Sequence, residues 1–453
     1  MFAKATTVYE AAAVCDPDLA LEAGDPRYID LSLHRGTDVV QQLYRAIRVK
    51  EEAVVKGIIS RDQGFAKLLL TGLRGAGKTT ELNRLCGLLE REGYFPLLIS
   101  GVRELDLERL THTELLMSLL WALQDARPVG PFRIQVPRRA DEELNLALAS
   151  TIVEAKDKES AEVKLQTEFG VTAGVPFYLK VKMGLRSMLA ASTERSRTVK
   201  AQIFQRTSTF LTTLNHILDE VQADLRERGC KGLVFLIDEL DRLPPRKAED
   251  FPELTIPQLL FDLQSPDLKA PRAHVLYTFP SQLLVSVNLG KSWSERPLFI
   301  PAVRIFDRSS GEAYGPGREA LMALVGARVD IDQVFSPPAG LQELILFGGG
   351  YARDLLRLVR YAANRTDNVI GAAEIHGAKR DLVAEYDRLL TTPLLEPLLR
   401  VDRERRLPPD PEFGELLERN LVLTYWNDEE WAHLHPAVRE TPGYRAYRTP
   451  ATG

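Results

Sequence analysis

The stretch Gly72-Leu73-Arg74-Gly75-Ala76-Gly77-Lys78-Thr79 decides the fold class of this 453-residue chain. It matches the pattern G-x-x-x-x-G-K-[ST], in which glycines let the backbone turn tightly and point N–H groups at phosphate oxygens. An apolar run at 67–71 precedes it, and an amphipathic helix pattern follows at 80–92, whose dipole would add its positive end to the site. Strand, loop and helix together predict a nucleoside triphosphate site rather than a glycine-rich turn with a chance lysine.

Each position of this loop has an expected role. Lys78 would meet the β- and γ-phosphates as a point charge, and the Thr79 hydroxyl would bind Mg²⁺. The residues expected to surround the nucleotide are Gly72, Arg74, Gly75, Ala76, Gly77, Lys78, Thr79 and Thr80.

A second, acidic segment strengthens this prediction. The apolar run 232–237 ends in Asp238-Glu239, as expected where a parallel strand opens into a site at its carboxyl end. Asp238 is placed to hold Mg²⁺ directly or through water, and Glu239 is the candidate that polarises the attacking water. Carboxylates at a strand end are often solvated turn residues, but the upstream loop favours the catalytic interpretation. Asp241 and Arg242 either extend this site or form surface salt bridges, and we expect the salt bridges for both.

Composition indicates an ordinary globular chain of about three domains, because 45% of the residues are hydrophobic and 27% are charged. The net charge of -5 gives no global attraction to nucleic acid or anionic membranes. Cys15, Cys86 and Cys230 lack C-x-x-C spacing, which argues against a zinc site or a disulfide framework and fits a reducing compartment. No apolar run approaches the roughly 18 residues of a membrane helix, and the N-terminus lacks a secretion signal. We therefore expect a cytoplasmic protein with no membrane partner.

Strand and helix patterns alternate along the chain. Strands are predicted at 67–71, 95–100, 233–237, 274–279 and 298–305. Helical patterns separate most of them, which predicts crossover connections and an α/β fold with a parallel sheet sandwiched by helices. We expect residues 1–65 to lead into the nucleotide site and residues 66–310 to form the core. Within the lead-in, the stretch 28–52, which contains Asp30, Arg35 and Gly36 and then an amphipathic helix, would close over the base.

Together with Gly348-Gly349-Gly350-Tyr351-Ala352-Arg353-Asp354, these motifs resemble an AAA+ P-loop ATPase, nearest the origin-recognition-like and STAND signalling branches. The resemblance covers 28–378 outside a long insertion, and it implies ATP and Mg²⁺ as ligands. It also implies that Thr278, or Ser281 in its place, senses the γ-phosphate, and that Arg353 is a second sensor on a helical lid. A guanidinium suits this role because its fork can meet a phosphate while it stays charged. The alternative for Arg353 is a surface arginine at a helix start.

The same resemblance implies an arginine finger, supplied by a neighbouring subunit, just before the fifth strand. Arg296 occupies that place. If it acts in trans, hydrolysis requires a homo-oligomer or a larger protein complex. The equally open alternative is that Arg296 pairs with Glu295 or caps a loop.

Residues 127–230 form an insertion between the second and third predicted strands. A crossover connection between two parallel strands needs only about a dozen residues. Alternation at 168–183, around Gly174-Val175-Pro176, predicts a β-hairpin. Its apolar face would carry Phe177, Leu179, Val181 and Met183, and its basic face Tyr178, Lys180 and Lys182. Solvated lysines are commoner on such a face than contacts with nucleic acid. A long helix up to Arg228 follows, led by Arg195, Arg197 and Arg206, with the core stripe Phe204, Leu211, Leu214, Ile217, Leu218 and Val221.

After the lid, expected at 311–378, residues 379–453 form an end piece. Its helical patterns, a proline-broken linker at 407–411, a short helix at 412–419 and a hairpin at 421–435 resemble a winged helix.

The charge of this end piece argues against DNA. It carries 11 Lys/Arg against 14 Asp/Glu, and its presumed wing tip, Trp426 to Glu430, is acidic, so phosphate would be repelled. Nucleic acid is thus possible but unsupported by charge, and protein binding or packing is expected. His433 and His435 share a strand face, but without a third ligand a structural pair is expected rather than a metal site.

Two function classes follow. The first is an AAA+-type ATPase that hydrolyses ATP to drive assembly or conformational switching of a larger complex, through Lys78, Thr79, Asp238 and Glu239. The second is a STAND-like signalling switch or an ATP-binding adaptor with little turnover. The intact Glu239 disfavours the adaptor.

Overall fold

The computed structural model describes residues 3–153, 157–170, 174–190, 198–199, 202, 206–249, 251–308, 311–426 and 429–448. At its centre is a five-stranded sheet in the order β2-β3-β4-β1-β5, in which every neighbouring pair is parallel. The strands are β1 (Lys67–Gly72), β2 (Phe95–Ser100), β3 (Leu233–Asp238), β4 (His274–Thr278) and β5 (Leu298–Ile300). Because the strands are parallel, their carboxyl ends, and the loops that follow them, lie at one edge of the sheet.

Helices cover both faces of this sheet. Along β3, Phe235 and Ile237 pack into one hydrophobic cluster, and Val234 and Leu236 pack into another on the opposite face. The first cluster includes side chains of α6 (His112–Gln124) and α11 (Thr207–Glu227), and the second those of α3 (Val39–Val55) and α4 (Lys78–Arg91). Burial on both faces explains why these strands are continuous apolar runs in the sequence.

All five predicted strands are confirmed, with small differences at their ends. The largest concerns the fifth strand, which ends at Ile300 rather than at residue 305. Pro301 follows directly, and a proline has no N–H with which to continue the hydrogen-bond ladder.

The insertion is helical where a hairpin was predicted, so the prediction of a hairpin at 168–183 is wrong. Its described helices include α7 (Arg138–Val153), α8 (Lys158–Phe169) and α9 (Phe177–Ala190), and α9 packs against α7 and α8. Val181, Leu185 and Met188 of α9 are buried at helical spacing, whereas Met183 is half exposed. Residues 171–173 of the predicted hairpin, and Arg195, Arg197 and Phe204 before α11, lie outside the described residues.

The expected basic face is also wrong. Lys180 is buried and its Nζ lies 2.7 Å from Glu162 Oε2. Lys182 is buried between Glu104, at 2.8 Å, and Asp125, at 3.0 Å. Both ammonium groups are neutralised inside the protein, so this part of the insertion offers no basic stripe to a phosphate backbone.

Shorter elements surround the sheet. They are α2 (Ser32–Arg35), η1 (Arg61–Gln63), α5 (Gly101–Glu104), η2 (Leu240–Arg242), α12 (Ile256–Gln258), η3 (Leu259–Leu263), α13 (Ser265–Lys269), α14 (Leu283–Ser286) and α15 (Leu289–Ser292).

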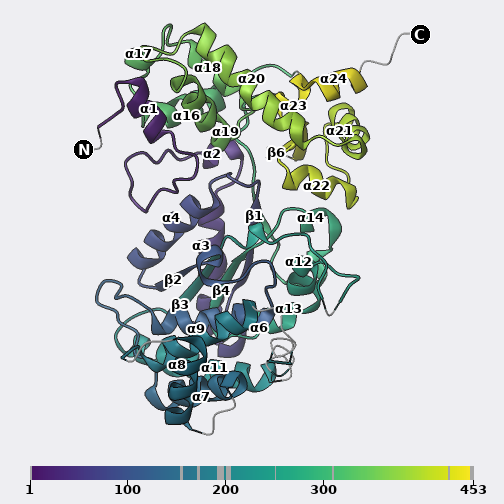
Figure 1. Ribbon diagram of the computed structural model, residues 1–453. Helices are drawn as coiled ribbons and strands as arrows, with labels where there is room; N and C mark the ends of the chain where they lie inside the picture. The colour runs from purple at the N-terminus through teal and green to yellow at the C-terminus, as the bar shows by residue number, and fades with distance from the viewer. Residues whose placement is uncertain are drawn as a thin grey trace.

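The lid and the C-terminal piece form the far end of the molecule from α7, α8 and α9 (Figure 1). Their helices are α16 (Gly315–Gly326), α17 (Ile331–Val334), α18 (Gly340–Phe347), α19 (Ala352–Ala363), α20 (Ala372–Leu389), α21 (Thr392–Glu404), α22 (Glu412–Glu418), α23 (Pro436–Glu440) and α24 (Pro442–Arg448). Between α22 and α23 lies an antiparallel hairpin made of β6 (Val422–Trp426) and β7 (Glu430–Leu434). The N-terminal helix α1 (Val8–Val14) shares one hydrophobic cluster with the lid and the C-terminal piece.

The predicted fold class is confirmed as an α/β fold: a parallel sheet lies between helices, and a helical lid and a C-terminal piece of helices with an antiparallel hairpin follow it. The domain boundaries stay a prediction, and α20 runs across the one proposed at 378. No described helix combines the length and apolar character that crossing a membrane requires.

Candidate nucleotide-binding site

The loop that joins β1 to α4 contains two glycines with backbone angles that other residues rarely adopt. Gly75 has a φ of 92° and Gly77 a φ of 94°. A Cβ on Gly75 would lie 2.7 Å from the Tyr351 hydroxyl oxygen and would also collide with the Arg353 side chain. Tyr351 and Arg353 stand at the start of α19, so the lid can contact the loop this closely only because residue 75 has no side chain.

Lys78, the first residue of α4, is buried inside this loop. Its Nζ donates to the carbonyl oxygens of Gly72, at 2.9 Å, and Leu73, at 3.0 Å, and lies 3.0 Å from Asp241 Oδ2. The Asp241 side chain is only 10% exposed, so the expectation of a surface salt bridge is wrong for this residue. The short helix η2 turns Asp241 inward, where its charge compensates the buried ammonium group.

Thr79 and Asp238 meet where α4 begins and β3 ends. Thr79 Oγ1 donates to Asp238 Oδ2 at 2.6 Å, and the Glu239 N–H donates to Asp238 Oδ1 at 2.7 Å. Burial raises the pKa of the Asp238 carboxyl, although both hydrogen bonds act in the opposite direction. A hydroxyl and a carboxylate this close supply the hard oxygen ligands that Mg²⁺ prefers, so these residues fit the ion implied by the sequence.

Glu239 follows with a left-handed φ of 66°. Its Oε2 accepts a hydrogen bond from Ser100 Oγ, and its Oε1 lies 3.2 Å from Arg242 Nη2. The β2–β3 register places Ser100 beside Asp238, which brings the serine within reach. Sequence reasoning missed Ser100, because a lone serine at a strand end has no signal until the order of the strands is known.

Thr278 is fully buried at the end of β4. Its hydroxyl accepts from the Leu240 N–H at 2.9 Å and donates to the Ile237 carbonyl at 3.3 Å. Thr278 thus holds the backbone on both sides of Asp238-Glu239. Neither Thr278 nor Ser281 lines the cavity described below, and a sensing role for either stays a prediction.

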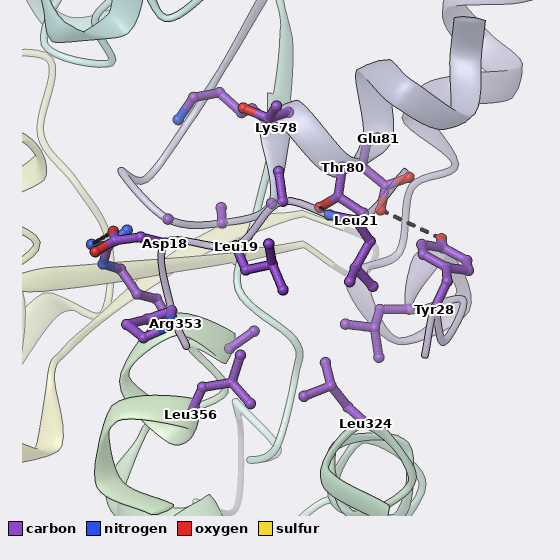
Figure 2. A pocket seen from close by; sticks show the side chains of 18 of the residues that line it. Asp18, Leu19, Leu21, Tyr28, Lys78, Thr80, Glu81, Leu324, Arg353 and Leu356 are labelled. Carbon is purple, nitrogen blue, oxygen red and sulfur yellow. Dashed lines mark hydrogen bonds and ion pairs between the residues drawn. The ribbon is translucent and has the colours of Figure 1, made fainter. Parts of the chain in front are cut away.

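Residues 16–21, which we call the strap, run from the lid to α4. The Leu21 N–H donates to Thr80 Oγ1 at 3.2 Å, and the Leu21 carbonyl accepts from Asn83 Nδ2 at 2.9 Å. Toward the other end of the strap, Asp18 Oδ1 and Arg353 Nη2 are 2.5 Å apart. Figure 2 shows the Asp18–Arg353 pair and the Leu21–Thr80 contact with Leu19 between them.

The loop, the strap and the lid enclose a cavity. Of the residues that the sequence places around the nucleotide, all except Gly72 line this cavity, and Glu239, Asp241 and Arg353 line it too. Its apolar side chains include Leu19, Leu21, Tyr28, Leu324 and Leu356, which are labelled in Figure 2. The cavity therefore has a charged part at the loop and an apolar part between strap and lid.

Arg35 holds the β1–α4 loop through a hydrogen bond to its backbone. It is 6% exposed, and its Nη2 donates to the Ala76 carbonyl at 2.7 Å while its Nη1 donates to Glu81 Oε1 at 3.2 Å. Burial lowers the pKa of Arg35, and the Glu81 charge opposes that shift. The sequence places Arg35 in the lead-in without a role, because its partners are more than forty positions away.

Arg296 lies away from this cavity. Its guanidinium stands 5.4 Å from the centre of the Trp426 ring, and it lines a separate hollow between β5 and the β6–β7 hairpin. Glu295, its expected alternative partner, lies 3.8 Å from Lys50 instead. A finger acting in a neighbouring subunit stays a prediction.

The two histidines of the C-terminal piece pack against aromatic rings. His433 stacks on Phe306 at 5.9 Å and His435 on Tyr386 at 4.4 Å, measured between ring centres. Burial lowers the pKa of both to about 4, so each is neutral at pH 7. Within the described residues, no group of three or more His, Cys, Asp or Glu is arranged to hold a metal.

No protein-family model and no curated protein matches this chain. Three solved structures align with it over nearly its full length. They are a Walker-type ATPase of Pyrococcus abyssi (14% identity, 94% of this chain and 98% of that one, TM-score 0.42), the ORC2 protein of Aeropyrum pernix in ADPNP and ADP complexes (12%, 93% and 93%, 0.39) and Cdc6p from Pyrobaculum aerophilum (11%, 96% and 95%, 0.34).

Proposed function

We propose that this cavity binds ATP with Mg²⁺ and that the chain hydrolyses ATP to drive assembly or conformational switching of a larger complex. The observation that carries the proposal is the 2.6 Å contact between Thr79 Oγ1 and Asp238 Oδ2, beside Lys78 and Glu239 at the carboxyl edge of a parallel sheet. Phosphoryl transfer asks a protein mainly for positioning and for neutralisation of charge, and these four side chains supply both.

The side chains of the site have separate roles in this proposal. The N–H groups of the loop and the Lys78 ammonium bind phosphate oxygens, and Arg353 adds a guanidinium from the lid. Mg²⁺ held by Thr79 and Asp238 would neutralise charge on the phosphate chain. Glu239 orients a water molecule, and the oxygen of this water bonds to the terminal phosphorus. The Glu239 carboxylate accepts the proton that the water loses. The bond from that phosphorus to the bridging oxygen breaks, and ADP keeps the electron pair.

The apolar part of the cavity suits a purine ring. Leu19 and Leu21 of the strap, Tyr28, and Leu324 and Leu356 of the lid line it. Binding pockets of small molecules combine such apolar walls with a few polar groups that fix orientation. The choice of adenine over guanine comes from the sequence resemblance.

A nucleotide-dependent switch with little turnover is the second candidate. It is favoured by the two partners of Glu239, because the carboxylate accepts from Ser100 and faces Arg242 at 3.2 Å. A carboxylate engaged in this way orients a water only after its partners move. Turnover would then depend on a conformational change.

Steady-state hydrolysis and nucleotide binding of Glu239→Gln test the ATPase. Hydrolysis is expected to fall about 100-fold or more, as when a general base is lost, while affinity for a fluorescent ATP analogue stays within about threefold. Ser100→Ala, which removes only a partner of Glu239, is the matched variant and should keep or raise turnover. Retained ADP with negligible wild-type turnover would establish the switch instead, and a chain that binds no nucleotide would refute both.

The oligomer is tested separately through Arg296. If Arg296 completes the site of a neighbour, hydrolysis per chain rises with protein concentration, and Arg296→Ala lowers it by about three orders of magnitude. The particle size of Glu239→Gln, measured by light scattering, should increase with ATP. A monomer of constant size with concentration-independent turnover would contradict the finger.

A further inference from the structure

A second cavity adjoins the nucleotide cavity and has a different chemistry. It has a volume of about 440 Å³, and most of the residues that line it are charged or polar. We call it the arginine chamber because its side chains include Arg74, Arg353, Arg357 and Arg360, with Tyr361 and Asn420. At about 30 Å³ for each water, the chamber has room for a small anion with part of its hydration shell.

The four guanidinium groups differ in how firmly they are already paired. Arg357 is already paired within the lid, with Asp354 at 2.9 Å and with Glu385. Arg74 is exposed and forms no ion pair with any described residue. This leaves Arg353 and Arg360, whose partners come from the strap.

The strap carboxylates are placed where an anion would bind. Asp18 pairs with Arg353 at 2.5 Å, and Asp16 lies 3.4 Å from Arg360. The Asp18 side chain is 73% exposed and that of Asp16 is 43% exposed, so neither is locked in place by packing. Exposed ion pairs of this kind contribute little to stability, and a doubly charged oxyanion can replace them at modest cost.

The Asp18–Arg353 pair stands between the two cavities. Pro17, Asp18, Arg74 and Arg353 line both of them. In Figure 2 the pair closes one side of the nucleotide cavity, across the loop from Lys78. An anion that leaves the loop on this side therefore meets Arg353 first and Arg360, about two turns further along α19, afterwards.

We propose that the arginine chamber is a binding site for inorganic phosphate, which it receives from the terminal position of the nucleotide, with the Asp18–Arg353 pair as its gate. The inference rests on the proposed function. Guanidinium forks match the oxygens of a phosphate and form charge-assisted hydrogen bonds with it. As phosphate enters, Arg353 and Arg360 exchange the strap carboxylates for phosphate oxygens, and the strap is released from the lid.

Equilibrium dialysis of radiolabelled inorganic phosphate against the full-length, ADP-saturated protein tests the site. Arg360 lines the chamber and not the nucleotide cavity, so Arg360→Gln should weaken phosphate binding about 10-fold, as for the loss of one charge-assisted hydrogen bond, with ADP affinity unchanged. Arg380→Gln, at an exposed arginine of α20 that lines neither cavity, removes the same charge and should bind phosphate as the wild type does. Asp18→Asn removes the competing carboxylate and should tighten phosphate binding.

A second measurement identifies the source of the phosphate. In a single turnover followed with a fluorescent phosphate sensor, Arg360→Gln should change the rate of phosphate release about 10-fold and leave ADP release unchanged. Equal phosphate affinity of Arg360→Gln and wild type, or an equal loss in Arg380→Gln, would overturn the chamber. ADP binding without phosphate binding refutes the chamber alone, whereas absence of ADP binding refutes the proposed function itself.

Discussion

Asp238 is a carboxylate buried at the end of a β-strand, 3% exposed, and burial raises its pKa. Its two hydrogen bonds, from Thr79 and from the Glu239 N–H, only partly offset the loss of hydration. In the unfolded chain the same carboxyl ionises near pH 3.9, so above that pH the folded protein holds the charge at a cost. A carboxylate that stays charged although it is buried away from water is typical of a site that gives up folding stability for ligand binding.

Asp238→Asn should therefore stabilise the nucleotide-free protein at neutral pH. A raised folded-state pKa contributes stability below the unfolded pKa and loses it as pH rises, so the advantage of the variant grows from about pH 4 to pH 7. We expect a gain on the order of 1 kcal/mol, together with loss of Mg²⁺-dependent nucleotide binding. Thermal melts between pH 4.5 and 8 measure the gain. Asp62→Asn, at a 67% exposed carboxylate, serves as control, and a variant less stable than wild type at pH 7 would contradict the account.

At the scale of single residues, the sequence predicts those site residues that belong to a motif of fixed spacing. Lys78, Thr79 and Glu239 belong to such patterns, and the structure places them around one cavity. Ser100 was missed and Asp241 was expected in a surface salt bridge, because their roles come from strand register and from a helical turn that no short pattern encodes. A contact formed by distant segments has no local signature in a single sequence.

The strands are the elements that the sequence predicts best. Each is buried on both faces, so a short apolar run bounded by polar residues is sufficient to mark it. Helix α9 was misassigned because Phe177, Leu179, Val181 and Met183 alternate with polar residues, which also occurs in a helix whose buried face is partly lysine. Lys180 and Lys182 are buried there only because acidic residues from other helices meet them, and that is tertiary information.

Two substitutions distinguish the helix from the hairpin. In a hairpin Val181 and Met183 would share a face, whereas in α9 Val181 is fully buried and Met183 is 50% exposed. Val181→Asp should therefore destabilise the protein by about 3 kcal/mol or more, through an unpaired buried charge, and Met183→Asp by about 0.5 kcal/mol or less. Urea denaturation followed by circular dichroism measures both. Equal and large losses would support the hairpin.

On the scale of the whole molecule, the lid and the C-terminal piece are one hydrophobic unit with the N-terminal helix. The cluster that contains Val8 and Ala11 of α1 also contains Val359 of α19 and Leu398 of α21. The separate end piece expected from the sequence thus shares its core with the lid. Periodicity within a segment shows that it has an apolar face but not which other segment covers that face.

A chain that ends at residue 378 should not fold correctly. It loses Leu382, Leu398, Phe413 and Leu416 from the cluster, each fully buried and each stabilising by about 1.5–3 kcal/mol, which together compares with the whole stability of a typical domain. A chain that ends at Tyr444 keeps these contacts and should melt like the full protein. Soluble yield, melting temperature and ADP binding measure the difference. A stable, nucleotide-binding chain of 378 residues would show that the lid does not need the end piece.

The shared cluster also affects the order of events during synthesis. Helix α1 leaves the ribosome first, but its partners in α19 follow roughly 350 residues later, a delay of roughly 20 to 70 s at the usual rates of translation. The strap next to α1 has no lid to pair with during that interval, and the nucleotide cavity lacks one wall. A nascent chain therefore carries an open phosphate loop and acquires a closed nucleotide cavity only after α19 has been synthesised.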